Sequence, residues 1–197
     1  MKRLVLLLSL VAATLVGFAQ TTEKYTEDDA MQFYRTIQGD YTGKINDTTS
    51  ITLHFTPIWE HEGNRFRWLY MEAVNNESQQ VVEQKIIEIK PISSVSFKVL
   101  VHDLSQPQRF VGKWGNRNFF DGFNTGILKR NSRFVFLKTK DFDYQTSWNG
   151  RKGLKCFPSG DRLHFKFSQE DERFYIKRLP KHTSNLIGIT FFKALTD

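Results

Sequence analysis

Residues 65–90 of this 197-residue chain read Arg65-Phe-Arg-Trp-Leu-Tyr-Met-Glu-Ala-Val74, then Asn75-Asn-Glu-Ser-Gln79, then Gln80-Val-Val-Glu-Gln-Lys-Ile-Ile-Glu-Ile-Lys90. The first and third segments are rich in β-branched and aromatic residues, which favour strands, and the segment between them is short and polar. The stretch therefore predicts a β-hairpin with its loop over residues 75–79, and we place this hairpin at the centre of the fold.

One face of the predicted hairpin has an unusual mixture of side chains. Because side chains alternate between faces along a strand, a loop over 75–79 places Tyr70 opposite Gln84. A register shifted by one residue would replace Gln84 with Lys85 on this face, and both registers stay open. The face then combines aromatic rings with a carboxylate and an amide or amine, carried by Trp68, Tyr70, Glu72 and either Gln84 or Lys85. A face that only packed a core would not need this mixture.

The first 19 residues have the pattern of a secretory signal peptide. A basic start is followed by an apolar run from Leu4 to Val16 and by small residues before Gln20. The run is shorter than the roughly 20 residues of a membrane-spanning helix, and no later stretch qualifies. We expect cleavage near Ala19-Gln20 and an exported, periplasmic or secreted protein. Its mature part, residues 20–197, would be one domain without a transmembrane segment.

Composition narrows the chemistry that the chain can carry. The net charge is +7, but lysines and arginines are scattered and often alternate with apolar residues, so we expect no nucleic-acid binding. The single cysteine, Cys156, excludes an internal disulfide. The five histidines lack the close spacing of metal ligands, so no metal site is predicted. No residue is assigned a catalytic role.

The rest of the chain predicts one helix followed by strands. Thr26-Glu-Asp-Asp29 resembles a capping box, and apolar residues at helical spacing follow it, so a helix is predicted over residues 27–38. From Asp40 onward about ten short strands with regular turns follow, among them Phe110–Trp114. Many short antiparallel strands indicate an all-β barrel or sandwich, and closing the sheet would remove its edges.

The content of aromatic residues leaves the interior of such a barrel open to two interpretations. The chain has 18 phenylalanines. A barrel of about eight to ten strands can enclose a small ligand, and an aromatic wall suits a flat or lipid-like molecule. The same rings could instead pack a dry core.

Several short motifs, in order along the chain, resemble the CpcT/CpeT-type chromophore lyase family, whose members attach bilins to antenna proteins. No single motif is specific, and their order and spacing carry the resemblance over most of the mature chain. The chain departs from the family pattern at Lys85, where the family prefers arginine, and at Ala73, where glutamine is usual. The motifs are Gln38-Gly-Asp-Tyr41, Phe55-Thr-Pro57, Leu69-Tyr-Met-Glu72, Gln84-Lys85, Phe110-Val-Gly-Lys-Trp114 and Lys155-Cys156 with Pro158-Ser159.

This resemblance implies a lipocalin-like (calycin) antiparallel barrel that holds an open-chain tetrapyrrole in its cup, commonly as a dimer. It further implies that Glu72 faces the pyrrole nitrogens, with Tyr70 and Gln84 as hydrogen-bond partners. Lys85 would meet a propionate only in the alternative register or at the rim of the barrel. The full set of ligand-binding candidates is Trp68, Tyr70, Glu72, Gln84, Lys85 and Trp114.

Three functions follow as expectations. The first is an exported barrel that binds a bilin-like tetrapyrrole or another small hydrophobic ligand, with no cofactor required. The second is an active lyase that joins a bilin to a cysteine of an acceptor protein. The third is an envelope structural or interaction protein with a fully packed barrel.

Overall fold

The computed structural model describes residues 27–60, 67–140, 143–146, 162–179 and 187–194. The predicted signal peptide and Cys156 lie outside these residues. Among the described helices, none is long and apolar enough to cross a bilayer.

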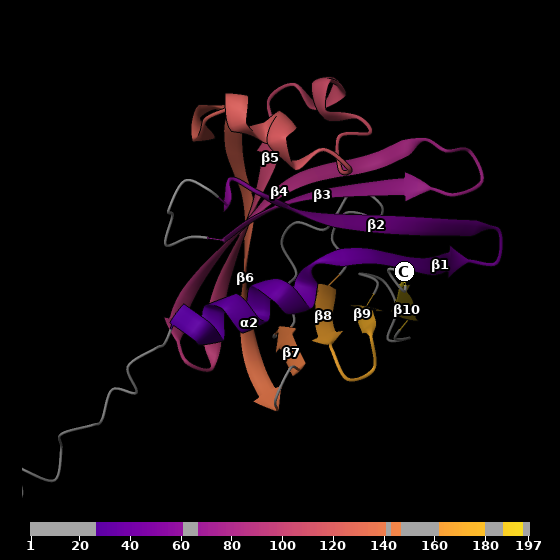
Figure 1. Ribbon diagram of the computed structural model, residues 1–197. Helices are drawn as coiled ribbons and strands as arrows, with labels where there is room; N and C mark the ends of the chain where they lie inside the picture. Colours follow the sequence, from indigo (N-terminus) through magenta and orange to yellow (C-terminus); the bar gives the residue numbers. More distant parts are fainter. Residues whose placement is uncertain (1–26, 61–66, 141–142, 147–161, 180–186, 195–197) are drawn as a thin grey trace, which may run out of the picture.

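The protein is a closed barrel of ten antiparallel strands (Figure 1), in which each strand pairs with its neighbours in sequence and β1 pairs with β10. This confirms the predicted all-β antiparallel barrel with one N-terminal helix. The strands are β1 (Gly39–Asn46), β2 (Thr49–Ile58), β3 (Arg67–Asn75), β4 (Val81–Ser93), β5 (Ser96–Leu104), β6 (Leu128–Lys140), β7 (Asp143–Thr146), β8 (Arg162–Ser168), β9 (Arg173–Leu179) and β10 (Ile187–Lys193).

Helix α2 (Glu27–Ile37) lies across one end of the barrel, as Figure 1 shows. Its apolar stripe is buried, since Ala30, Phe33, Tyr34 and Ile37 are each at most 4% exposed. The ring of Phe33 packs between strands, with centroids 4.8 Å from Phe97 and 4.5 Å from Tyr144. The predicted helix over 27–38 is therefore confirmed to within one residue.

The central hairpin forms between β3 and β4, but its expected register is wrong by two residues. Tyr70 pairs with Ile86 instead of Gln84. The loop shifts the pairing by one residue, because Val74 lies opposite Val81, and a β-bulge at Val82 shifts it by one more. Since the two shifts add to an even number, the same side chains still share a face.

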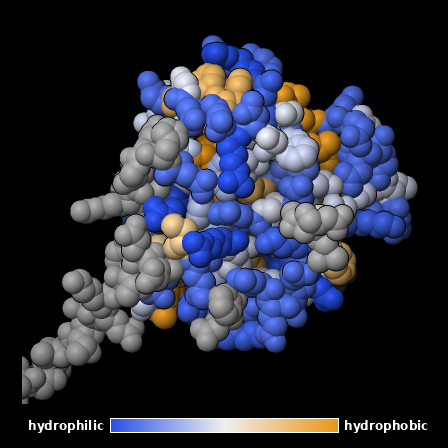
Figure 2. Space-filling view, viewed as in Figure 1, coloured by the Kyte–Doolittle hydropathy of each residue, from blue (hydrophilic) through white to orange (hydrophobic). Residues whose placement is uncertain are grey.

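Three short 3-10 helices connect β5 to β6: η2 (Pro107–Phe110), η3 (Arg117–Gly122) and η4 (Thr125–Ile127). We call this segment, residues 107–127, the cap. The predicted strand over Phe110–Trp114 is wrong, because Pro107 begins a helical turn and Gly112 has a positive φ of 69° that interrupts extended backbone. Figure 2 shows apolar side chains among hydrophilic ones at the top of the molecule, over the cap.

Buried apolar side chains of the described residues form two hydrophobic clusters, one on each side of the β3–β4 wall. The larger fills the barrel and includes Leu69 and Met71. The smaller lies outside the barrel beneath the cap, where Trp68 and Tyr70 meet Phe120. Both faces of β3 are therefore buried.

Candidate functional site

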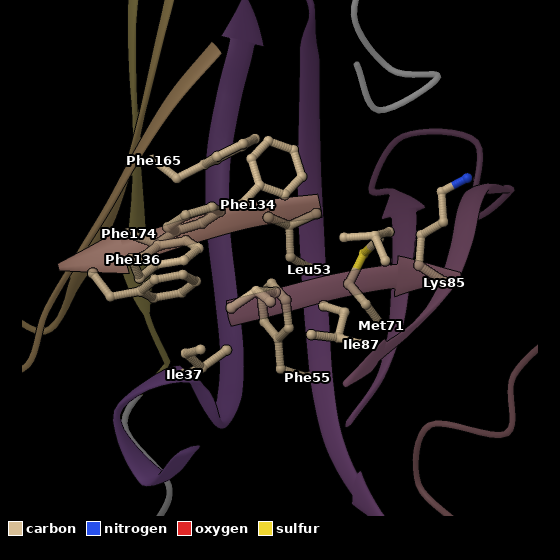
Figure 3. Close-up of a pocket in the computed structure, with 13 residues that line it drawn as sticks. Ile37, Leu53, Phe55, Met71, Lys85, Ile87, Phe134, Phe136, Phe165 and Phe174 are labelled. Atoms are coloured by element: carbon tan, nitrogen blue, oxygen red, sulfur yellow. The ribbon is translucent and has the colours of Figure 1, made fainter. Parts of the chain in front are cut away.

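The barrel encloses an apolar cavity of about 60 Å³. Its wall is built from inward-facing residues of several strands, and Figure 3 shows a cluster of phenylalanine rings along one side. A molecule in this cavity would make dispersion contacts with aromatic and aliphatic side chains, and these side chains offer it no hydrogen bonds. The main wall residues are Leu53, Phe55, Phe134, Phe136, Phe165 and Phe174.

Of the described residues that line this cavity, Lys85 is the one that carries a charge. It faces inward because β4 alternates, so that Lys85 shares the inner face with Ile87 and Ile89. Its carbon stem lines the cavity, whereas its nitrogen points away from the phenylalanine rings (Figure 3). The side chain is only 4% exposed, so its ammonium group needs partners inside the protein.

Two carboxylates supply these partners. The ammonium nitrogen of Lys85 lies 2.5 Å from Asp103 on β5 and 3.0 Å from Glu83 on its own strand. Burial alone would lower the pKa of Lys85, but the hydrogen bonds and charges of Asp103 and Glu83 outweigh it and raise that pKa above its ordinary value. Lys85 therefore stays charged at the edge of an apolar space.

A groove of about 350 Å³ lies on the other side of Lys85, between β4 and β5. The pairing of these strands ends at Ile86 and His102, although β4 continues to Val81 and β5 to Leu104. The groove occupies the space where the two strands diverge, and its wall includes Lys85, Asp103 and Pro107. Lys85 thus lines both the inner cavity and the outer groove.

The expected polar face of the hairpin exists, and it points outward beneath the cap. Glu72 is completely buried there, and its carboxylate accepts hydrogen bonds from the hydroxyl of Tyr70 at 2.5 Å and from the amide of Gln84 at 3.2 Å. It also accepts the backbone N–H of Gly112. Burial, together with the hydrogen bond to Glu72, raises the pKa of Tyr70 far above its ordinary range, so its hydroxyl stays protonated.

Trp114 lies on the same outer side. Its ring stacks on the ring of His54 with centroids 3.9 Å apart and an angle of 6° between planes. His54 Nδ1 is 2.9 Å from a carboxylate oxygen of Asp40. Asp40, His54, Glu72 and Gln84 occupy paired positions on four consecutive strands, so they form one polar row across the outer wall.

The structure thus divides the six predicted site residues between two sides of the wall. Tyr70, Glu72 and Gln84 contact one another on the outer side, and Trp68 and Trp114 lie on that side too, whereas Lys85 lies on the inner side. The six residues therefore do not form one continuous surface that could face a single ligand. Ligand contacts of the five outer residues stay a prediction.

Sequence reasoning missed Asp103 and the individual phenylalanines of the wall. The alternation in Phe134-Val-Phe136 was a usable signal, since it places two rings on one face of a strand. No comparable signal pointed to Asp103, because its approach to Lys85 depends on which strands are neighbours. Among the described residues, no three histidine, cysteine, aspartate or glutamate side chains come together in a way that could hold a metal ion.

The fold and the site define a class of protein: a closed antiparallel β-barrel with an apolar interior that could hold a small ligand. No model of a known protein family matches this chain, and no curated protein matches it either.

Proposed function

We propose that this protein is exported and that its barrel binds a small hydrophobic ligand. The observation that carries the proposal is the apolar cavity inside the barrel, with the buried Lys85 at its edge. Leaving about 60 Å³ of core empty costs about 1.4 kcal/mol at the usual penalty for cavity volume. A barrel that served only as a packed scaffold, the structural alternative, would gain stability by filling this space.

Ligand entry requires side chains to move. Pockets for small molecules usually begin at about 300 Å³, so the cavity in its present state is too small for most ligands. Met71 and Lys85 are flexible side chains in the described part of its wall. Met71 can change rotamer at low cost. The stem of Lys85, by contrast, can shift only while its ammonium group keeps its pairs with Asp103 and Glu83. Movement of Lys85 would join the cavity to the groove between β4 and β5.

A cavity-filling substitution tests the proposal. Val99→Phe adds a ring to the cavity wall and should abolish binding of N-phenyl-1-naphthylamine, a neutral apolar dye whose fluorescence rises when it is bound. Val95→Phe is the matched control, because Val95 is 48% exposed and lies outside the cavity wall. Dye binding by a folded Val99→Phe variant, at the affinity of the parent, would refute binding in the barrel.

A bilin-like tetrapyrrole is the second candidate ligand. In its favour, residues of the motifs that resemble the chromophore lyases interact in the structure, since Tyr70, Glu72 and Gly112 form one hydrogen-bonded group. Titration with biliverdin tests this candidate by absorption, and an unchanged spectrum at micromolar protein would count against it. A Glu72→Ala variant that bound biliverdin as tightly as the parent would remove the proposed role of Glu72.

Lyase activity would add one covalent step to this binding. It requires a bilin and an acceptor protein with a free cysteine in the same compartment. Incubating all three and then denaturing the mixture tests the reaction, because a thioether-linked bilin stays with the acceptor. Loss of all colour from the acceptor band would exclude it.

A further inference from the structure

We infer that the ligand of the barrel is an amphipathic acid, whose apolar chain fills the cavity and whose carboxylate pairs with Lys85 in place of Asp103. This inference rests on the proposed binding of a hydrophobic ligand, and it names the chemical class of that ligand. It follows from the position, the burial and the partners of Lys85.

The position of Lys85 decides where the polar end of a ligand would lie. Every other wall residue in the part of the chain that the structure describes is apolar, so a polar group among them would lose its hydrogen bonds to water without replacing them. The ammonium group of Lys85 lies where the cavity meets the groove. A ligand with its chain among the phenylalanine rings therefore has its head group at Lys85.

The two present partners of Lys85 differ in how easily they can leave. The side chain of Glu83 is 1% exposed, whereas that of Asp103 is 41% exposed and borders the groove. Asp103 can therefore turn toward water and recover its hydration, while Glu83 cannot. Asp103 is the partner that a ligand would replace.

Charge balance favours an acid over other head groups. When a ligand carboxylate replaces the carboxylate of Asp103, the number of charges around Lys85 is unchanged, so the exchange buries no additional net charge. A neutral hydroxyl would form a weaker hydrogen bond with Lys85 than the ionised Asp103 already does. An ammonium head group would be repelled by Lys85.

The groove gives the exchange room and a route. It holds about 350 Å³ at the place where β4 and β5 are no longer paired. A ligand can enter there without breaking strand-to-strand hydrogen bonds, and the groove then holds the head group and the displaced Asp103.

Displacement of N-phenyl-1-naphthylamine from the full chain by three ten-carbon probes tests this inference. At pH 7 decanoic acid should displace the dye with at least about tenfold higher affinity than decanol, because a hydrogen bond between charged groups is stronger than a neutral one. Decylamine should be the weakest. In Lys85→Met, which keeps an unbranched apolar stem, the preference for the acid should disappear.

Asp103→Asn is the second variant, and it matters if Lys85→Met fails to fold. It removes the competing carboxylate and leaves Lys85 paired with Glu83, so decanoic acid should bind several-fold more tightly while decanol is unaffected. The inference would be overturned if decanoic acid and decanol bound with equal affinity in the parent and in Asp103→Asn, or if decylamine bound most tightly. Either result would leave the proposed binding of a hydrophobic ligand intact. Failure of the dye itself to bind would overturn the proposed function as well.

Discussion

The carboxylate of Glu72 accepts the backbone N–H of Gly112 with both of its oxygens, each at 3.1 Å. This contact joins β3 to the cap. The hydroxyl of Tyr70 lies beside it, 2.8 Å from the carbonyl oxygen of Phe110. The cap is therefore held to the barrel by buried hydrogen bonds as well as by the aromatic cluster beneath it.

Gly112→Ala should lower the free energy of unfolding by about 1 kcal/mol, because the backbone at Gly112 is left-handed and disfavours a Cβ atom. A Cβ there would meet no atom within 4 Å, so the cost is conformational alone. Gly115→Ala is the control, since Gly115 also has open space and lacks the positive φ. Urea unfolding measures both, and equal stability of the two variants would contradict this account of Gly112.

Glu72→Ala should destabilise the protein by about 2 kcal/mol, because it removes the acceptor of the Gly112 N–H. The amide of Gln84 also loses one of its two acceptors and keeps the hydroxyl of Tyr70. Glu72→Gln should cost less, since its oxygen can still accept from Gly112 and its amide can donate to Tyr70. Thermal and urea unfolding of both variants check the order. The anchoring role of Glu72 would be wrong if alanine and glutamine gave the same stability.

The alternation of apolar residues along the strands made the fold predictable, whereas the exact register of the hairpin could not be predicted. The hairpin at 65–90 and the helix over 27–38 both follow from hydrophobic periodicity and turn residues. The bulge at Val82 leaves no trace in that periodicity, because it depends on how the strands twist against each other. Glu72 and Gln84 still lie on the same face, as predicted, because the register differs from the expected one by two residues and side chains alternate between faces.

Which face points inward could not be predicted from the hairpin alone. A half-buried strand has one apolar face, but β3 has apolar residues on both, with Leu69 inside the barrel and Trp68 beneath the cap. The aromatic and polar face suggested the lining of a cup, and in the structure it lies outside the barrel and contacts the cap. The roles of Gln84 and Lys85 depended on a one-residue choice of register, and only the structure separates them.

Gly43→Ala should destabilise the barrel by about 1–3 kcal/mol through overpacking. A Cβ at Gly43 would lie 2.6 Å from the carbonyl oxygen of Thr190 and 2.8 Å from the ring of Phe191. Gly43 pairs with Phe191 where β1 meets β10 and closes the barrel, so the clash opens the seam.

Gly188→Ala is the matched control for Gly43→Ala. Gly188 is on β10, the strand that pairs with β1, but a Cβ there would meet no atom within 4 Å. The substitution should be neutral or slightly stabilising, since alanine loses less backbone entropy than glycine on folding. Circular dichroism melts of the two variants check this contrast, and a Gly43→Ala protein as stable as Gly188→Ala would refute the tight seam.

Glu88 should make the stability of the protein sensitive to acid. Burial alone would raise the pKa of Glu88, but hydrogen bonds and charges from His102, at 3.3 Å, and Lys90, at 2.6 Å, outweigh it and hold that pKa below its ordinary value of 4.5. A carboxyl group whose pKa is lower in the folded state stabilises it above the pKa of the unfolded chain. That contribution is lost as the pH falls through the folded-state pKa.

Glu88→Gln should therefore lose less stability than the parent between about pH 6 and about pH 3, although it is less stable at pH 6. The free energy of unfolding in urea, measured for both proteins at several pH values, gives the difference. Glu170→Gln is the control: its side chain is 70% exposed, and its pair with Lys140 lies at the surface, where ion pairs contribute little. If His102 and Lys90 stabilise the charge on Glu88, the stabilities of the parent and of Glu88→Gln should approach each other as the pH falls. Parallel pH profiles of the two proteins would contradict that stabilisation.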